Sequence, residues 1–221
     1  MSFRRQNNIY VEQCLRGCLP ELLHVNHFWD KHRGCVVAKI LPGEFYMTKD
    51  NVMIATTLGS CISACIWDSR LGIGGMNHFM LPIKGDSIGH DGWQSNNSYT
   101  CRYGLWAMEY LINEILKYGG MRQNLQVKLF GGGRVLQNMS SDVGDQNIIF
   151  AQDYVLNEGL PIVCADVGGP WPRKILFYPE TGRVLVKKLQ TTHNDTIQLR
   201  ERQYRASLES SVRDSAGIEL F

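Results

Sequence analysis

The chain has 221 residues, of which 44% are hydrophobic and 20% are charged, and its formal net charge is +2. This size and composition fit one globular domain with a sizeable core, and the small charge argues against a nucleic acid or an anionic membrane as the main partner. No apolar run approaches the length of a membrane span and no export signal is visible, so the sequence predicts a cytoplasmic protein without membrane insertion.

The first 35 residues differ in composition from the rest of the chain. Cysteines and histidines are frequent between positions 14 and 35, but no Cys-x2-Cys pair is present, and the spacing does not match the common zinc patterns. We interpret residues 1–35 as an N-terminal extension without a metal, with an amphipathic helix near residues 9–23. The seven cysteines of the chain are odd in number and irregularly spaced, which favours reduced thiols over a disulfide framework.

Strands and helices follow from residue 36 onward. Apolar alternation predicts extended segments at residues 36–41, 44–47 and 51–58, a hairpin around 68–71, and later strands at 125–130, 161–167, 174–178 and 183–189. Helical spacing and end signals predict helices at residues 98–118 and 145–157. The order of these elements along the chain indicates an α+β sandwich with a mixed, largely antiparallel sheet, because the strands come in groups separated by single helices. Residues 191–221 form a polar tail in which 194–214 fit an exposed helix with mixed charges.

One cysteine and one histidine face each other in the predicted hairpin. If its turn has a two-residue tip, Cys61 lies directly opposite His78, and directly opposed Cβ atoms are about 4.5–5.5 Å apart. The same register pairs Ser63 with Met76, Cys65 with Gly74 and Trp67 with Gly72. A thiol beside an imidazole is the arrangement of a cysteine nucleophile and its base. The alternative stays open that both residues only fill the core, since a lone buried cysteine is usually a small hydrophobe.

The residues just before the cysteine suit a nucleophile. Gly59 permits a sharp chain reversal and close approach by a substrate, and the backbone N–H groups of Ser60 and Cys61 are candidates for an oxyanion hole. A second glycine run, 131–133, follows a predicted strand. No Gly-Lys-Ser/Thr comes after it, so we interpret it as a tight loop and not as a phosphate-binding loop.

At these residues the chain resembles the bacterial chemoreceptor glutamine deamidases called CheD. The similarity covers roughly residues 36–189 and rests on several blocks in the family's order. They are Leu58-Gly-Ser-Cys61, Gly72-Ile-Gly-Gly-Met-Asn-His78-Phe-Met-Leu-Pro82, Lys128-Leu-Phe-Gly-Gly-Gly133, Asn147, Pro161-Ile162, Asp166-Val-Gly-Gly169, Arg173-Lys174 and Pro179-Glu-Thr-Gly182.

The resemblance implies a fold and an activity. It implies a three-layer α/β/β sandwich over residues 36–190, related to deamidating toxin domains. It also implies hydrolysis of glutamine side chains to glutamate on methyl-accepting chemotaxis receptors, with Cys61 as nucleophile, His78 as base and no cofactor or metal. A CheC-type phosphatase is implied as a further partner, and Trp93 with the loop 84–97 is a candidate rim for the receptor.

The sequence departs from the family pattern near the nucleophile. An assisting threonine often lies six residues before the cysteine, where this chain has Ala55, and we take Thr56 as its substitute. Two other functions therefore stay open: a cysteine amidase of other specificity, and a non-catalytic adaptor that binds receptors or a CheC-type phosphatase.

Overall fold

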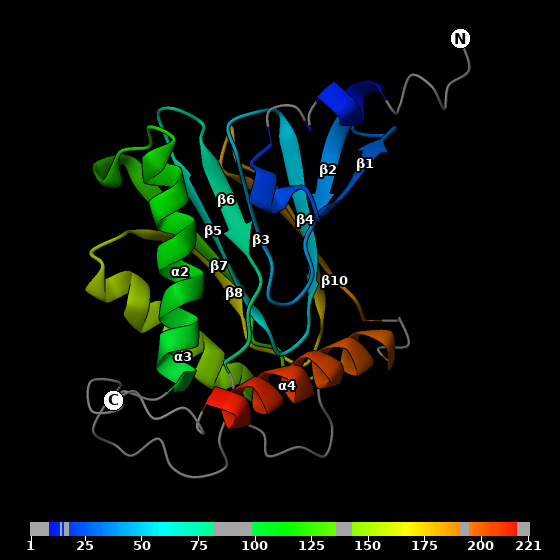
Figure 1. The fold of residues 1–221 in the computed structure, drawn as a ribbon, viewed down its shortest axis with the longest axis vertical. Helices are drawn as coiled ribbons and strands as arrows, with labels where there is room; N and C mark the ends of the chain where they lie inside the picture. The colour runs from blue at the N-terminus through cyan, green and yellow to red at the C-terminus, as the bar shows by residue number, and fades with distance from the viewer. Residues whose placement is uncertain are drawn as a thin grey trace.

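A computed structural model gives the structure and describes residues 9–13, 15, 18–81, 99–135, 143–190 and 195–215. Its strands form two five-stranded sheets (Figure 1). The first sheet has the order β1 (Asn26–Asp30), β2 (Cys35–Lys39), β4 (Val52–Leu58), β9 (Arg173–Tyr178) and β10 (Arg183–Lys188). The second has the order β3 (Phe45–Thr48), β6 (Gly74–Asn77), β5 (Ile62–Asp68), β7 (Leu125–Gly131) and β8 (Ile162–Val167).

Both sheets are mixed, and antiparallel pairing predominates in each. Parallel pairing occurs only between β2 and β4 in the first sheet and between β7 and β8 in the second, among the strands that the structure describes. The predicted α+β class with mixed, largely antiparallel pairing is confirmed. The strands divide between two sheets.

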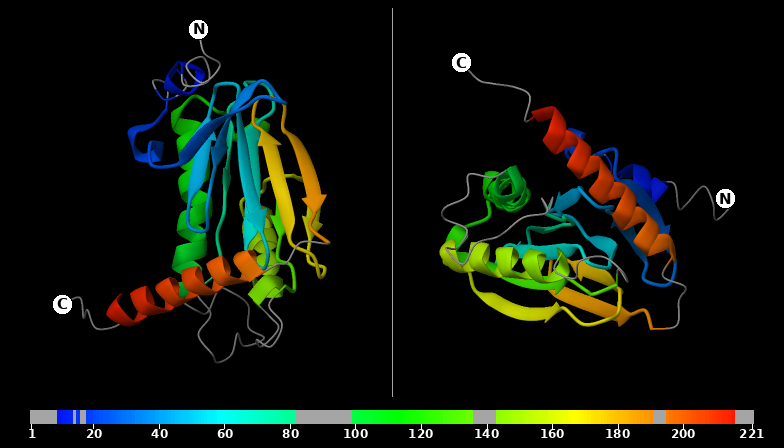
Figure 2. Two further views of the ribbon diagram at one scale, coloured as in Figure 1. Left: turned by 90° about the vertical axis from the view of Figure 1, so that its right-hand side faces the viewer. Right: turned by 90° about the horizontal axis from the view of Figure 1, so that it is seen from below.

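The main core lies between the two sheets and under two helices. The ring of Trp67 on β5 lies 6.1 Å from the ring of Phe177 on β9, so side chains of the two sheets meet directly. Helices α2 (Tyr99–Lys117) and α3 (Val143–Asn157) pack on the second sheet (Figure 2). The apolar stripe of α2 is buried there, as its spacing predicts; it includes Met108, Leu111, Ile112 and Ile115.

The hairpin of β5 and β6 has a different register from the predicted one. Cys65 pairs with Met76 and Trp67 with Gly74, a shift of two residues from the expected pairs. The cause is the wider turn, in which the carboxylate of Asp68 accepts hydrogen bonds from the backbone N–H groups of Arg70 and Leu71. A shift of two residues keeps every side chain on its expected face, because strand side chains alternate with a period of two.

The two ends of the chain add elements to this framework. Residues 26–30, within the stretch interpreted as an extension, form β1 and pair with β2 along one edge of the first sheet. Residues 9–13 and 15 are helical, and a 3-10 helix follows at Pro20–Leu22. No helix in the described part of the chain is long and apolar enough to cross a membrane.

Helix α4 (Asp195–Ser215) lies across one end of the sheets (Figures 1 and 2). Its position in the sequence agrees with the helix expected at 194–214. The expectation that this helix is exposed is wrong for one face, because Glu201 and Leu208 are only 2% and 6% exposed.

Candidate active site

The predicted nucleophile lies where the chain passes from one sheet to the other. Strand β4 of the first sheet ends at Leu58 and β5 of the second begins at Ile62, so Gly59, Ser60 and Cys61 form the crossing. The glycine loop after β7 holds this crossing in place, since the N–H of Gly133 donates to the carbonyl of Gly59 at 2.7 Å.

A glycine is required at the start of that loop. Gly131 has a φ of 115°, and an added Cβ would lie 2.2 Å from the carbonyl oxygen of Cys61. The carbonyl of Cys61 also accepts a 2.7 Å hydrogen bond from the N–H of Gly132. The interpretation of residues 131–133 as a tight loop agrees with these contacts, and the loop supports the nucleophile turn.

Asn147 on α3 fixes the same crossing from a second side. Its Nδ2 donates to the carbonyl of Ser60 at 2.9 Å, and its Oδ1 accepts from the N–H of Leu81 at 2.8 Å. The side chain is fully buried. One amide therefore joins the turn before Cys61 to the segment that follows His78.

His78 comes one residue after β6 and is held by Thr56 on β4. Ile62 and Phe79 exchange two backbone hydrogen bonds and so form a directly opposed antiparallel pair. Cys61 and His78, one residue before each of them, therefore lie diagonally across the two segments and not directly opposite as predicted. Diagonal neighbours lie within reach of long side chains. The predicted pair thus comes together despite the shifted register, because both side chains stay on one face.

The hydrogen bonds of Thr56 define the tautomer of His78. The Thr56 hydroxyl donates its one proton to the carbonyl of Ile40 at 2.9 Å, so the 2.7 Å contact with His78 Nδ1 must be donated by the ring. Nε2 then carries the lone pair, and this buried atom has no hydrogen-bond partner among the described residues. The imidazole is arranged to accept a proton at Nε2.

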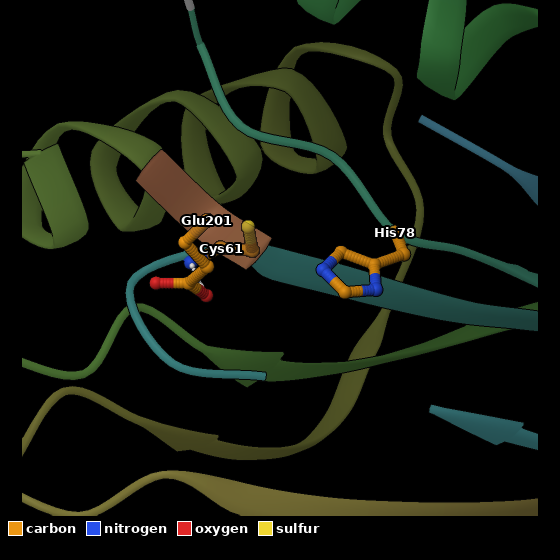
Figure 3. Close-up of side chains that lie close together, drawn as sticks. All are labelled: Cys61, His78 and Glu201. Carbon is orange, nitrogen blue, oxygen red and sulfur yellow. Dashed lines mark hydrogen bonds between the residues drawn. The ribbon is translucent and has the colours of Figure 1, made fainter. Parts of the chain in front are cut away.

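Glu201 of α4, which was not among the predicted site residues, completes the cluster. A ring nitrogen of His78, the sulfur of Cys61 and a carboxylate oxygen of Glu201 all lie within 4.8 Å of one another. Figure 3 shows the three side chains converging from three different segments. The only sequence signal for Glu201 is its place on a helical stripe with Tyr204 and Leu208.

The Glu201 carboxylate is bound by the crossing itself. Its Oε1 accepts from the backbone N–H groups of Gly59 at 2.8 Å and Cys61 at 3.2 Å. Its Oε2 accepts from the N–H of Ser60 at 2.9 Å and from the Ser60 hydroxyl at 2.7 Å. A Cβ at position 59 would lie 2.7 and 2.8 Å from these two oxygens, so glycine leaves the room that the carboxylate needs.

Burial keeps both reactive groups neutral in this arrangement. It lowers the pKa of His78 to about 3. Burial raises the pKa of the Cys61 thiol well above its usual value, and the negative charge of Glu201 and its hydrogen bond to the thiol raise it further. With α4 in place, a neutral thiol therefore lies beside a neutral imidazole, and neither is accessible from outside, since Cys61 is 0% and His78 2% exposed.

Sulfur, imidazole and carboxylate are also the ligand types of zinc sites. Here, however, both Glu201 oxygens are already engaged by four N–H and O–H donors, which is the environment of a bound anion. The histidine, in turn, is tied through Nδ1 to Thr56. The cluster is better described as a thiol–imidazole pair next to an anion-binding turn than as a metal centre.

Comparisons with known proteins identify the family. A probable chemoreceptor glutamine deamidase CheD from Halorhodospira halophila is 52% identical over 205 residues, which cover 92% of this chain and 93% of the relative. Proteins of the same name from Hahella chejuensis and Saccharophagus degradans are 47% and 46% identical, and the matches cover 92% and 94% of this chain and 93% and 94% of the two relatives, respectively. The chain belongs to the CheD family. The family model described as CheD chemotactic sensory transduction matches residues 80–188.

Other cysteines lie away from the crossing. Cys65 is buried on β5 and pairs with Met76, whereas Cys164 on β8 is exposed. Trp93 and the loop 84–97 lie outside the described residues, as does Cys14. The structure thus brings Thr56, Gly59, Ser60, Cys61 and His78 together, and adds Glu201.

Proposed function

We propose that this CheD protein hydrolyses the side-chain amide of specific glutamines on methyl-accepting chemotaxis receptors and leaves glutamate. The relatives carry the name chemoreceptor glutamine deamidase. The observation that carries the proposal is the Cys61 thiol beside a histidine whose free Nε2 is its basic atom. A thiol activated by a base is the nucleophile that amide hydrolysis requires.

The reaction begins with transfer of the thiol proton from Cys61 to Nε2 of His78. The thiolate attacks the carboxamide carbon of the receptor glutamine, while Thr56 holds Nδ1–H and keeps the ring in one orientation. The imidazolium then gives its proton to the departing ammonia. Water, activated by the same imidazole, cleaves the thioester and releases glutamate and the free thiol.

The N–H groups of the crossing stabilise the tetrahedral oxyanion. Ser60 and Cys61 are the predicted donors, and we add Gly59 because its N–H is directed at the same carboxylate oxygen as that of Cys61. Backbone donors of this kind cost no reorganisation during the reaction, and loss of one typically lowers turnover about 100- to 1000-fold.

The wider assignment follows from the family resemblance. We infer that the two sheets and the layer of α2 and α3 form the three-layer α/β/β sandwich related to deamidating toxin domains, with residues 36–190 as the deamidase domain, 1–35 as an extension and 191–221 as a tail. The protein works in the cytoplasm, where receptor cytoplasmic domains are accessible, and a CheC-type phosphatase is a further partner. It needs neither a metal nor an organic cofactor.

The test uses the full-length protein and a purified receptor cytoplasmic fragment. Ammonia release and peptide mass spectrometry should show glutamine converted to glutamate with the wild-type chain and not with Cys61→Ala. Cys164→Ala is the matched control, because that thiol is exposed on β8, away from the crossing, and its loss should leave turnover unchanged.

Two results would contradict the proposal. Wild-type turnover in Cys61→Ala would remove the nucleophile assignment. Absence of receptor conversion by both the wild-type chain and Glu201→Ala, in which the acid that covers Cys61 is removed, would favour the non-catalytic adaptor instead.

A further inference from the structure

Helix α4 presents to the site the side chain that the proposed reaction produces. Glutamate is the product of glutamine deamidation, and Glu201 holds its carboxylate against the three N–H groups of Gly59, Ser60 and Cys61. The carboxylate lies next to the thiol that would have carried the acyl group (Figure 3). Glu201 therefore occupies the position of a product glutamate that has not left.

The contacts of Glu201 exclude the more ordinary roles for a buried acid near a Cys–His pair. It does not orient the imidazole, because Nδ1 of His78 is bound by Thr56. It does not pair with a buried cation, since its hydrogen-bond partners among the described residues belong to the crossing. Its hydrogen bonds to the crossing are those that a product carboxylate would make.

The remaining contacts of α4 show how a helix lies on this site. Gln198 donates from Nε2 to the carbonyl of Val135 at 3.0 Å, and Tyr204 hydrogen-bonds to Tyr103 on α2. Leu208 is the one apolar side chain of the helix that is buried among those described, whereas Leu199 is 56% exposed. Positions 198, 201, 204 and 208 follow helical spacing, so α4 binds through a single narrow face.

Few apolar side chains of α4 are fully buried at this interface. Leu208 is buried, Ile197 and Tyr204 are half-buried, and Glu201 and Gln198 add hydrogen bonds. Because hydrophobic burial is the main source of stable docking between elements, an interface with so little of it suits displacement by another helix. A small cavity also remains between the helix and the site, lined in part by Ile197, Arg200, Thr56 and His78. A second helix with better complementarity could therefore replace α4.

We propose that α4 is a tethered product mimic, which occupies the receptor-helix groove with Glu201 in the glutamine position and masks Cys61 until a receptor helix displaces it. This inference rests on the proposed function and deepens it in two ways. It places the substrate glutamine in the middle of a receptor helix, which binds where α4 lies in this structure. It also makes the resting enzyme self-inhibited. The apparent Kd for receptor is then the intrinsic Kd divided by the fraction of molecules in which α4 has left the site.

The first experiment converts the mimic into a substrate. In the full-length Glu201→Gln variant, Cys61 Sγ attacks the introduced carboxamide carbon, the carbon–nitrogen bond breaks, ammonia leaves with the proton carried by His78, and water hydrolyses the thioester. The net reaction consumes one water and restores Glu201. Cleavage after Leu199 and Tyr204 releases a peptide of residues 200–204, in which fragment masses locate the change.

We expect the introduced amide to become a carboxylate in this variant and to persist in the double variant Cys61→Ala/Glu201→Gln. If the amide persists in the single variant while the same preparation deamidates a receptor fragment, the product-mimic position is wrong and the proposed function stands. If neither the introduced amide nor the receptor is converted, both proposals fail.

The second experiment removes the mask. Glu201→Ala should raise kcat/KM on a receptor fragment at least about tenfold, equivalent to about 1.4 kcal/mol. It should also speed iodoacetamide labelling of Cys61 at neutral pH by a similar factor, because solvent regains access to the thiol. Gln203→Ala, at an exposed position on the same helix, should match the wild type in both measurements. Equal labelling and turnover in Glu201→Ala and Gln203→Ala would overturn the masking role.

Discussion

Thr56 accepts a 2.7 Å hydrogen bond from Nδ1 of His78 while its hydroxyl proton goes to the carbonyl of Ile40. One hydroxyl thus links β4 of the first sheet to the residue that follows β6 of the second. Because the bond fixes the proton at Nδ1, it leaves the lone pair at Nε2. In the proposed mechanism the threonine does what a carboxylate or amide does behind the histidine of other thiol and serine hydrolases.

Replacement of Thr56 should slow turnover without removing the nucleophile. Thr56→Val keeps the volume but leaves Nδ1–H of His78 without an acceptor, and a buried unpaired donor costs about 1–3 kcal/mol. We expect kcat on a receptor fragment to fall about 10- to 100-fold, since about 1.4 kcal/mol corresponds to tenfold in rate.

Thr56→Ser is the control for that loss. Serine retains the hydroxyl and should restore kcat to within a few-fold of the wild type, and only the valine variant should show an altered pH dependence of kcat/KM. If the serine and valine variants were equally slow, Thr56 would act through packing and not through its hydrogen bond.

Asn147 should contribute to stability through the two segments that it joins. Asn147→Leu leaves the carbonyl of Ser60 and the N–H of Leu81 buried without their partner, and each such group costs about 1–3 kcal/mol. We expect the free energy of unfolding at pH 7 to fall by about 2–6 kcal/mol, measured by urea denaturation. Ile149→Ala, at an exposed position on the same helix, should cost far less, and similar losses in the two variants would contradict the role of the amide.

Sequence patterns predicted the elements of this fold better than their register. From residue 36 onward, alternation and helix signals located the strands and helices because each is a local property of the chain, whereas β1 in the first 35 residues was missed. The pairing of β5 with β6 was misplaced by two residues, because the turn is widened by Asp68, whose carboxylate also binds the N–H of Met121 more than fifty residues away. No pattern within the hairpin reports such a distant contact.

The same limit explains which site residues could be predicted. Cys61 and His78 belong to one hairpin, so periodicity alone places them on one face, and Thr56 lies on the preceding strand. Glu201 reaches the site from a polar tail that follows the last strand, and its helix has the composition of a solvated surface element. Only the packing of that helix across the end of the sheets brings Glu201 to the crossing.

The burial of His78 should make the protein sensitive to mild acid. Its pKa is about 3 in the folded chain, below its ordinary value of 6.5, so between these pH values the unfolded chain binds a proton that the folded chain does not. Stability from this group is therefore present above about pH 6.5 and is lost as the pH falls, by at most about 1.4 kcal/mol per pH unit.

The free energy of unfolding of His78→Gln should fall by about 2 kcal/mol less than that of the wild type between pH 7 and pH 5, measured by urea denaturation at each pH. Because burial also lowers the pKa of His27, the quantity to compare is the difference between the two proteins. An unchanged slope in His78→Gln would show that the imidazole is already protonated in the folded state at pH 5.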